Sequence, residues 1–160
     1  MLNGPLLKRR LIRLAVVGCA GALLAGCASP AAVDLAPTTP GPSAAAACAA
    51  SAAALPHTVR DLPRREVQPS SPTTAAWGDP PITLTCGVPR PTQLQADTTL
   101  LSVDGVDWFA QQLTRGTRFT ATGRVAYLRV DVPEDYTSAT DALTDLADAV
   151  RKVPLADPGS

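Results

Sequence analysis

The stretch AAWGDPPITLTCGVP, residues 75–89, determines the fold that we predict for this chain. Its second half alternates from Ile82 to Val88, so Ile82, Leu84 and Cys86 point to one side and two threonines to the other. A period of two is typical of a β-strand with one buried face. We therefore expect a half-buried strand at 82–88 that carries a cysteine on its core face.

A hairpin is predicted downstream of this strand, in TLLSVDGVDWFAQQL, residues 99–113. The central Asp-Gly pair, residues 104 and 105, suits a two-residue type I′ turn because both positions need a positive φ. Such a turn places Val103 opposite Val106 and Leu101 opposite Trp108 on the same face. Aromatic–aliphatic pairs of this kind stabilise a hairpin by up to about 1 kcal/mol.

Another long strand is predicted from Val125 to Val132, because apolar and polar side chains alternate there. Its inward positions are apolar, and its outward positions are Tyr127, Arg129 and Asp131. A short strand at 118–122 precedes it, with a glycine at the turn.

A helix is predicted on the N-terminal side of the domain, at 44–55. Cys48, Ala52 and Leu55 share one face at spacings of four and three. Pro56 ends this helix, and a proline-rich connection follows as far as the strand at 82–88.

The last helix is the most clearly patterned element. Its apolar stripe recurs at three-and-four spacing and consists of Ala139, Ala142, Leu143, Leu146, Ala149, Val150 and Val153. Ser138 and Asp141 resemble a capping box in which Asp replaces the usual Glu. Pro154 ends the helix, and residues 155–160 are expected to form a flexible tail.

Residues 1–26 have the pattern of a lipoprotein signal peptide. Four basic residues precede an apolar run at 14–24, which is too short to span a bilayer. The run ends in LAGC, a lipobox whose Cys27 would carry the lipid after cleavage. A rival site at Cys19 would leave an apolar run of only about five residues, below the usual ~7–15. The remaining alternative is an ordinary secretory signal in which Cys27 is incidental.

Cys48 and Cys86 remain as a pair in the exported chain, where disulfides persist. A bridge between them would fasten the first helix to the sheet and stabilise the fold by about 4 kcal/mol. The alternative is two buried free thiols.

The mature chain is expected to have three parts. Residues 27–45, which are rich in Ala, Pro and Thr, would form the lipidated cysteine and a disordered tether. Residues 46–154 would form a single α+β domain, and the flexible tail would follow it. Removal of the signal leaves about four more acidic than basic residues, which argues against a nucleic-acid binder.

No residue pattern indicates catalysis, a metal site or a cofactor. His57 is the only histidine, which excludes a His-rich metal site, and no G-x-S-x-G motif is present. The aspartates of the last helix are better explained as a solvated face that complements the helix dipole. A hydrolase with a pair of carboxylates leaves no local pattern and remains open.

Arg60, Arg64 and Arg65 form the one basic cluster in the predicted domain. The cluster is a candidate anion-binding site for phospholipid headgroups or another anionic component of the envelope. The alternative, which we favour, is a solvated loop in which Asp61 and Glu66 are the local ion-pair partners.

Four runs carry a resemblance to a known family: AAWGDPPITLTCGVP, VDGVDWF, FTATGR and YLRVDVPEDY. They resemble an actinobacterial lipoprotein family with a domain of unknown function, DUF3515. The similarity covers about Cys48 to Pro154, nearly the whole predicted domain. It implies a lipid-anchored or secreted envelope protein and supplies no catalytic residues.

We therefore predict an α+β fold with one disulfide, in which a mostly antiparallel sheet of about four strands is flanked by an N-terminal and a C-terminal helix. The expected function is that of a non-enzymatic accessory protein on the extracytoplasmic face of the cell membrane. Its lipid would bind the membrane, and its partner would be an envelope protein. The alternative is a module for a small ligand or cell-wall polymer that uses the Arg64–Arg65 loop or Trp77. An unrecognised hydrolase is third.

Overall fold

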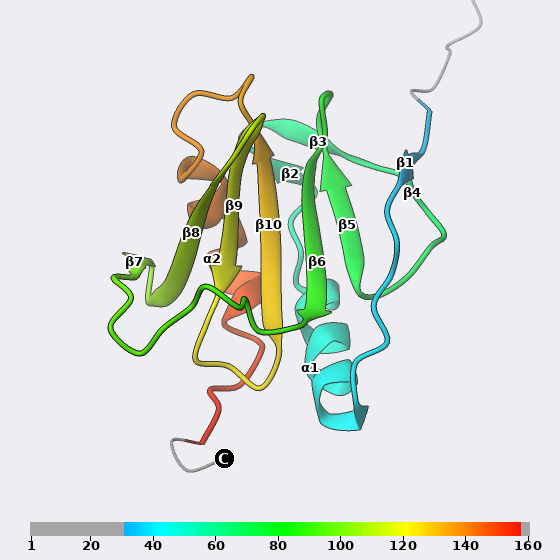
Figure 1. Cartoon of the computed structure of the whole chain (residues 1–160). Helices are drawn as coiled ribbons and strands as arrows, with labels where there is room; N and C mark the ends of the chain where they lie inside the picture. Colours follow the sequence, from blue (N-terminus) through cyan, green and yellow to red (C-terminus); the bar gives the residue numbers. More distant parts are fainter. Residues whose placement is uncertain (1–30, 158–160) are drawn as a thin grey trace, which may run out of the picture.

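The computed structural model describes residues 31–157, in which one antiparallel sheet of eight strands is backed by two helices (Figure 1). The helices α1 (Pro42–Ala53) and α2 (Asp141–Val150) lie behind the sheet in this view, so its front face is free of helices. The strand order is β2-β3-β5-β6-β10-β9-β8-β7. The strands are β2 (Thr58–Val59), β3 (Leu62–Arg65), β5 (Thr74–Trp77), β6 (Ile82–Val88), β7 (Leu101–Val103), β8 (Val106–Leu113), β9 (Gly116–Ala121) and β10 (Tyr127–Pro133).

The α+β class, the antiparallel sheet and the two helices are confirmed, but the expected number of about four strands is wrong. Strands β2, β3 and β5 lie in the segment that we expected to be an irregular proline-rich connection. Strands of two to four residues are too short to establish an alternating pattern. In addition, all four residues of β5 are buried, so no polar face marks it in the sequence.

The β7–β8 hairpin has the predicted turn and register. Asp104 and Gly105 have φ values of 46° and 74°. Val103 lies opposite Val106, and Leu101 lies opposite Trp108. The positive φ at both turn positions matches the right-handed twist of the strands, so the Asp-Gly pair fixes the register of this edge of the sheet.

Helix α1 is fastened to the sheet by the predicted disulfide. Cys48 and Cys86 are bonded, with a Cα–Cα distance of 5.7 Å. The helix starts two residues earlier than expected, because Pro42 occupies the first turn, where its missing N–H costs nothing. Only Ala47, Cys48 and Ser51 of this helix are buried, so the bond contributes much of its attachment.

The segment expected to be a disordered tether contains two regular pieces in its described part, residues 31–45. Within 27–45, strand β1 (Val33–Asp34) pairs in parallel with β4 (Val67–Gln68), and α1 begins at residue 42. Between them, the Thr38 N–H donates to the hydroxyl of Thr73 at 3.2 Å, and the Thr38 hydroxyl donates to the carbonyl of Cys86. Alternating hydrophobicity cannot reveal a segment that is ordered by backbone and hydroxyl contacts. The predicted signal peptide, residues 1–26, and Cys27 lie outside the described residues.

Helix α2 buries the predicted stripe, but the predicted capping box is wrong. Its buried residues are Ala142, Leu143, Leu146, Ala147, Ala149 and Val150. Thr140 is the N-cap, and no side chain caps the helix. Ser138 has a φ of 54° and uses its backbone carbonyl to accept the Asp141 N–H at 3.0 Å.

The chain after α2 is also attached to the connection between β9 and β10, at the start of the expected flexible tail. Leu155 forms a β-bridge with Arg124, and the Ala156 N–H donates to the Gly123 carbonyl at 3.0 Å. Arg124 is buried and donates to the Val153 carbonyl at 2.7 Å. Residues 158–160 lie outside the described part of the chain.

Candidate functional site

The structure separates the three arginines of the predicted anion-binding cluster. Arg60, in the turn between β2 and β3, lies against the start of α2: its Nη1 donates to the Ser138 carbonyl and lies 3.4 Å from Asp141 Oδ2. Its backbone N–H donates to the Asp145 carboxylate at 2.6 Å, and its guanidinium lies 5.8 Å from the centre of the Tyr136 ring. These contacts give Arg60 a structural role, with partners on α2 rather than in its own loop.

Arg64 and Arg65 are neighbours in β3, but they point to opposite faces of the strand. The Arg64 guanidinium lies 5.7 Å from the centre of the Trp77 ring. The Arg65 side chain is only 10% exposed and donates to the carbonyls of Gly78 and Ala31 at 2.6 and 2.7 Å. Neither side chain pairs with the predicted partners, Asp61 and Glu66; instead Arg65 lies 3.9 Å from Asp79.

Trp77 offers no exposed ring to a ligand. It is fully buried, and its Nε1–H donates to the Pro56 carbonyl at 3.1 Å. A pocket of about 240 Å³ does lie beside Arg64 and Arg65. The two donors of Arg65 that reach backbone carbonyls are already used, so this pocket offers a ligand little free hydrogen-bonding capacity from Arg65.

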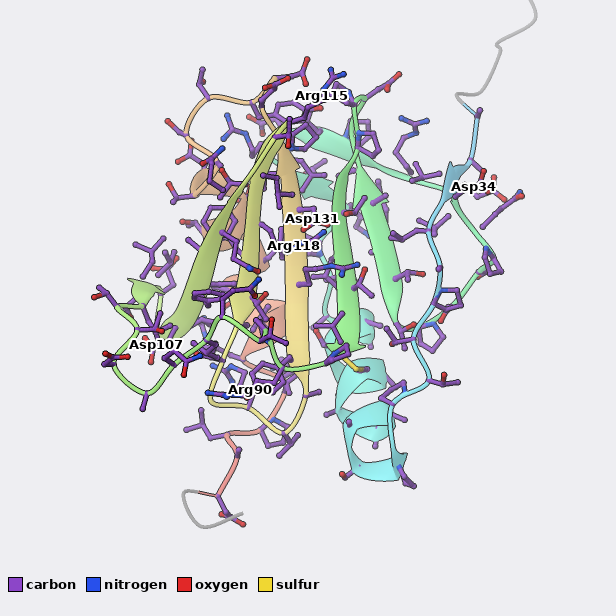
Figure 2. All side chains as sticks on the ribbon, in the orientation of Figure 1. Asp34, Arg90, Asp107, Arg115, Arg118 and Asp131 are labelled. Carbon is purple, nitrogen blue, oxygen red and sulfur yellow. A yellow bond between two sulfur atoms is a disulfide. The ribbon has the colours of Figure 1, made fainter. Side chains whose placement is uncertain are left out.

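A second cluster of charges lies on the open face of the sheet, where β9 and β10 are paired. In β10, Leu128, Val130 and Val132 are buried on the helix side, so Arg129 and Asp131 point to the other side. The β9–β10 register places Arg118 directly opposite Asp131. Figure 2 shows these two side chains next to each other near the middle of the open face.

Asp131 is shared between the two arginines. Arg118 donates to both of its oxygens, from Nε at 2.7 Å and from Nη2 at 2.9 Å. Arg129 Nε lies 3.6 Å from Asp131 Oδ2. The hydrogen bonds to Asp131 raise the pKa of Arg118 above its usual value, against the opposing effect of burial. Two guanidinium groups around one carboxylate leave the cluster with a net positive charge.

This cluster forms part of the floor of a pocket of about 240 Å³. The sheet contributes Val88, Gln111, Arg118, Thr120 and Arg129, and the loop after β6 contributes the wall through Pro89, Pro91, Thr92 and Gln93. The loop after β6 passes in front of β10 and β9 (Figure 1). The amide of Gln111 donates to Gln93 at 3.2 Å, which ties this loop to β8.

Arg129 is the side chain of this pocket that is best placed to bind a ligand. Within residues 31–157, its guanidinium forms the long ion pair with Asp131 and no side-chain hydrogen bond. Its side chain is 31% exposed and borders the pocket. The charge of the neighbouring Arg118 is already paired with Asp131, whereas the Arg129 guanidinium has free donors. Such a guanidinium favours a carboxylate or phosphate group, because its planar fork matches the oxygens of both.

The sequence predicted that Arg129 and Asp131 face outward, but it did not identify this site. The missing information is the pairing of Arg118 with Asp131, which depends on the register set by the turn between β9 and β10. The available signal was the spacing of Arg129 and Asp131, which carry opposite charges at positions i and i+2 of one strand. Residues at this spacing must share a face of the sheet, so the pattern indicates a cluster of charges there.

The described part of the chain contains no group of three or more His, Cys, Asp or Glu side chains that could hold a metal ion. Nor does it contain a helix both long and apolar enough to cross a bilayer. His57, the only histidine of the chain, is exposed in the bend before β2.

Comparison with known proteins identifies a family without an assigned activity. No curated protein and no solved structure matched the chain. The model of the family described as "Protein of unknown function (DUF3515)" matches residues 11–158, which is most of the chain. This chain therefore belongs to the DUF3515 family of proteins of unknown function.

Proposed function

We propose that this protein is a non-enzymatic binding protein of the cell envelope that takes an anionic group on the open face of its sheet. Lipid on Cys27 would hold it at the extracytoplasmic face of the membrane. The observation that carries the binding role is the Arg129 guanidinium, which borders a pocket of about 240 Å³ with no side-chain hydrogen bond to the described chain.

The size of the pocket limits the ligand. Pockets for drug-sized molecules usually measure about 300–1,000 Å³, so this one suits a single acidic group with a small body. A carboxylate or phosphate on a sugar, or a phospholipid headgroup, has this size and charge. The expected ligand is thus a small anion or the acidic end of an envelope polymer.

Arg118 and Asp131 support this role by positioning Arg129. The bidentate contact between them fixes the carboxylate, which in turn lies beside the Arg129 Nε. A purely structural explanation is a cross-strand ion-pair cluster, of the kind that contributes about 0.2–1 kcal/mol per pair. The two explanations differ in whether Arg129 affects binding or only stability.

The test is calorimetric titration of the purified protein with inorganic phosphate, glucuronate and phosphatidylglycerol vesicles. We expect at least one probe to bind, and Arg129→Gln to weaken that binding at least tenfold while the melting temperature stays within a few degrees. Arg115→Gln is the matched control, since Arg115 is 82% exposed and lies outside the pocket. Equal binding by the two variants would overturn the assignment of Arg129, and no binding of any probe would overturn the proposed ligand class.

The protein partner expected from the sequence stays a prediction, since no contact described here tests it. The hydrolase, which was the third hypothesis, stays a prediction as well.

A further inference from the structure

Thr120 lies beside Arg129 in the floor of the open-face pocket. The register of β9 and β10 places the two residues directly opposite each other. Side chains in such a pair have Cβ atoms about 4.5–5.5 Å apart. Thr120 also lines the pocket, and it shares the open face with Arg118, two residues before it on β9. The proposed anion site therefore contains a hydroxyl next to its arginine.

The hydroxyl of Thr120 is nearly buried but has no partner. The residue is 1% exposed, and within residues 31–157 its hydroxyl forms no hydrogen bond. The fully inaccessible side-chain N and O atoms that lack a partner in this part of the chain belong to Ser51, Thr74 and Trp108. The Thr120 oxygen is not one of them, so it touches the solvent in the pocket. Buried polar groups are normally hydrogen-bonded, so a ligand in the pocket would supply the partner that Thr120 lacks.

Gln111 contributes a free acceptor to the same pocket. Its side-chain N–H donates to Gln93 Oε1 at 3.2 Å, while its own Oε1 accepts no hydrogen bond from the described chain. An ionised carboxylate has only acceptors, so it cannot use this atom. A ligand hydroxyl can use it, because a hydroxyl both donates and accepts. The polar groups of the pocket thus match an acid that also carries hydroxyls.

The wall of the pocket requires a carbon body in the ligand. Val88, Pro89 and Pro91 line this side, and their side chains have no hydrogen-bonding group. They gain contacts only with the C–H groups of a ligand. A bare inorganic anion would leave this wall without contacts, whereas a ring of hydroxylated carbons has C–H groups to offer. Ligand pockets commonly combine apolar surface with a few polar groups in this way.

We propose that the pocket binds a sugar acid, a hydroxylated carbon ring that carries one carboxylate. Arg129 binds the carboxylate, Thr120 and Gln111 bind neighbouring hydroxyls, and the apolar wall contacts the ring. This ligand class rests on the proposed function, because Arg129 must hold the acidic group for Thr120 to reach a hydroxyl. The chain after residue 26 has about four more acidic than basic residues, so an anionic bilayer surface repels it. That charge favours a saccharide over a phospholipid headgroup.

Three small probes separate the acid from the hydroxyls. Glucuronate has both, cyclohexanecarboxylate has the ring and the carboxylate without hydroxyls, and glucose has the hydroxyls without the acid. Calorimetric titration of the purified full-length protein measures the affinity for each. We expect glucuronate to bind at least tenfold more tightly than either of the other two.

A pair of threonine variants tests the hydroxyl contact. Thr120→Val removes the hydroxyl and keeps the branched shape. Thr85→Val is the matched control, since Thr85 lies opposite Arg129 on its other side, is 2% exposed and does not line the pocket. We expect Thr120→Val to weaken glucuronate binding about fivefold, the effect of one lost hydrogen bond, and to leave cyclohexanecarboxylate binding unchanged. Thr85→Val should change neither affinity.

Three results would overturn the proposed ligand class. They are equal affinities for glucuronate and cyclohexanecarboxylate, equal glucuronate affinities of the Thr120→Val and Thr85→Val variants, and binding of phosphatidylglycerol vesicles without binding of glucuronate. Failure of the proposed function gives a different result, in which no acid binds or Arg129→Gln changes no affinity. An acid that binds through Arg129 without any contribution from Thr120 would therefore leave the anion site in place and remove only the sugar.

Discussion

The disulfide between α1 and β6 should contribute a large share of the free energy of unfolding. Cys48 and Cys86 are separated by 38 residues. On the chain-entropy model, closing a loop of that length stabilises the folded state by about 4 kcal/mol. Domains of ordinary size have total stabilities of about 5–15 kcal/mol. The double variant Cys48→Ala/Cys86→Ala is therefore expected to lose about 4 kcal/mol, with an additional small cost from the buried volume removed.

Urea unfolding of the parent and the double variant, followed by circular dichroism, measures this difference. The variant's unfolded chain is no longer cross-linked and exposes more surface, so the slope of the transition should increase as the midpoint falls. Reduction of the parent protein should reproduce the same loss. A change below about 1 kcal/mol, with an unchanged slope, would refute the argument from loop closure.

The same variant should loosen α1 more than any other element. Only three residues of α1 are buried, whereas α2 buries six. Without the bond, the amides of α1 should exchange with solvent much faster than those of α2, because local opening follows the number of buried contacts. Equal acceleration in both helices would mean that the bond stabilises the whole fold without fastening α1 in particular.

Three other changes have definite expected outcomes. Gly116→Ala should cost at least about 2 kcal/mol in thermal unfolding, because Gly116 has a φ of 135° and an added Cβ would collide with the Val132 carbonyl. Tyr136→Phe should cost about 1 kcal/mol through loss of the 2.7 Å hydrogen bond to the Pro80 carbonyl. Burial raises the pKa of Tyr136 above its usual value. The parent's excess in free energy of unfolding over this variant should therefore be full below a pH of about 10 and disappear as the pH rises through the raised pKa. Urea unfolding across that pH range measures this difference. Leu146→Ala should cost about 2–5 kcal/mol in urea unfolding, because the side chain is fully buried.

Two of these predictions have a control in the chain. Gly105→Ala is also at a positive φ but meets no atom, so it isolates the backbone cost from the collision at Gly116. Leu155→Ala removes a leucine that is 71% exposed and should change stability by less than about 0.5 kcal/mol. A Tyr136→Phe variant that kept the parent's full decline at high pH would assign that decline to another group.

Elements whose pattern depends on their own residues could be predicted from the sequence. The alternation at 82–88, the Asp104–Gly105 turn and the stripe of α2 each record a local geometry together with one buried face, and all three are present. The disulfide followed from the same logic, since both cysteines fell on core-facing positions. Where the determinants were non-local, prediction failed. Strand β5 is recognisable only once β3 and β6 are beside it.

The candidate site shows the same division. Arg60, Arg64 and Arg65 are close in sequence, but strand geometry and the approach of α2 send them to different partners. Arg118 and Asp131 are 13 residues apart, and only the antiparallel register between β9 and β10 brings them together. Proximity along the chain therefore did not reveal these contacts, since contacts between strands are determined by pairing rather than by spacing.

The attachment of the N-terminal segment restricts how the protein can stand on a membrane. Arg65 holds the carbonyl of Ala31, and β1 continues that attachment through its pairing with β4. From the proposed lipid on Cys27 to Ala31 is four residues, which reach at most about 14 Å when fully extended. The domain would then lie close to the lipid headgroups with little freedom to tilt, and it would not move on a long flexible tether. Such a protein searches its surroundings in two dimensions, and it meets only molecules that come within roughly its own diameter of the bilayer.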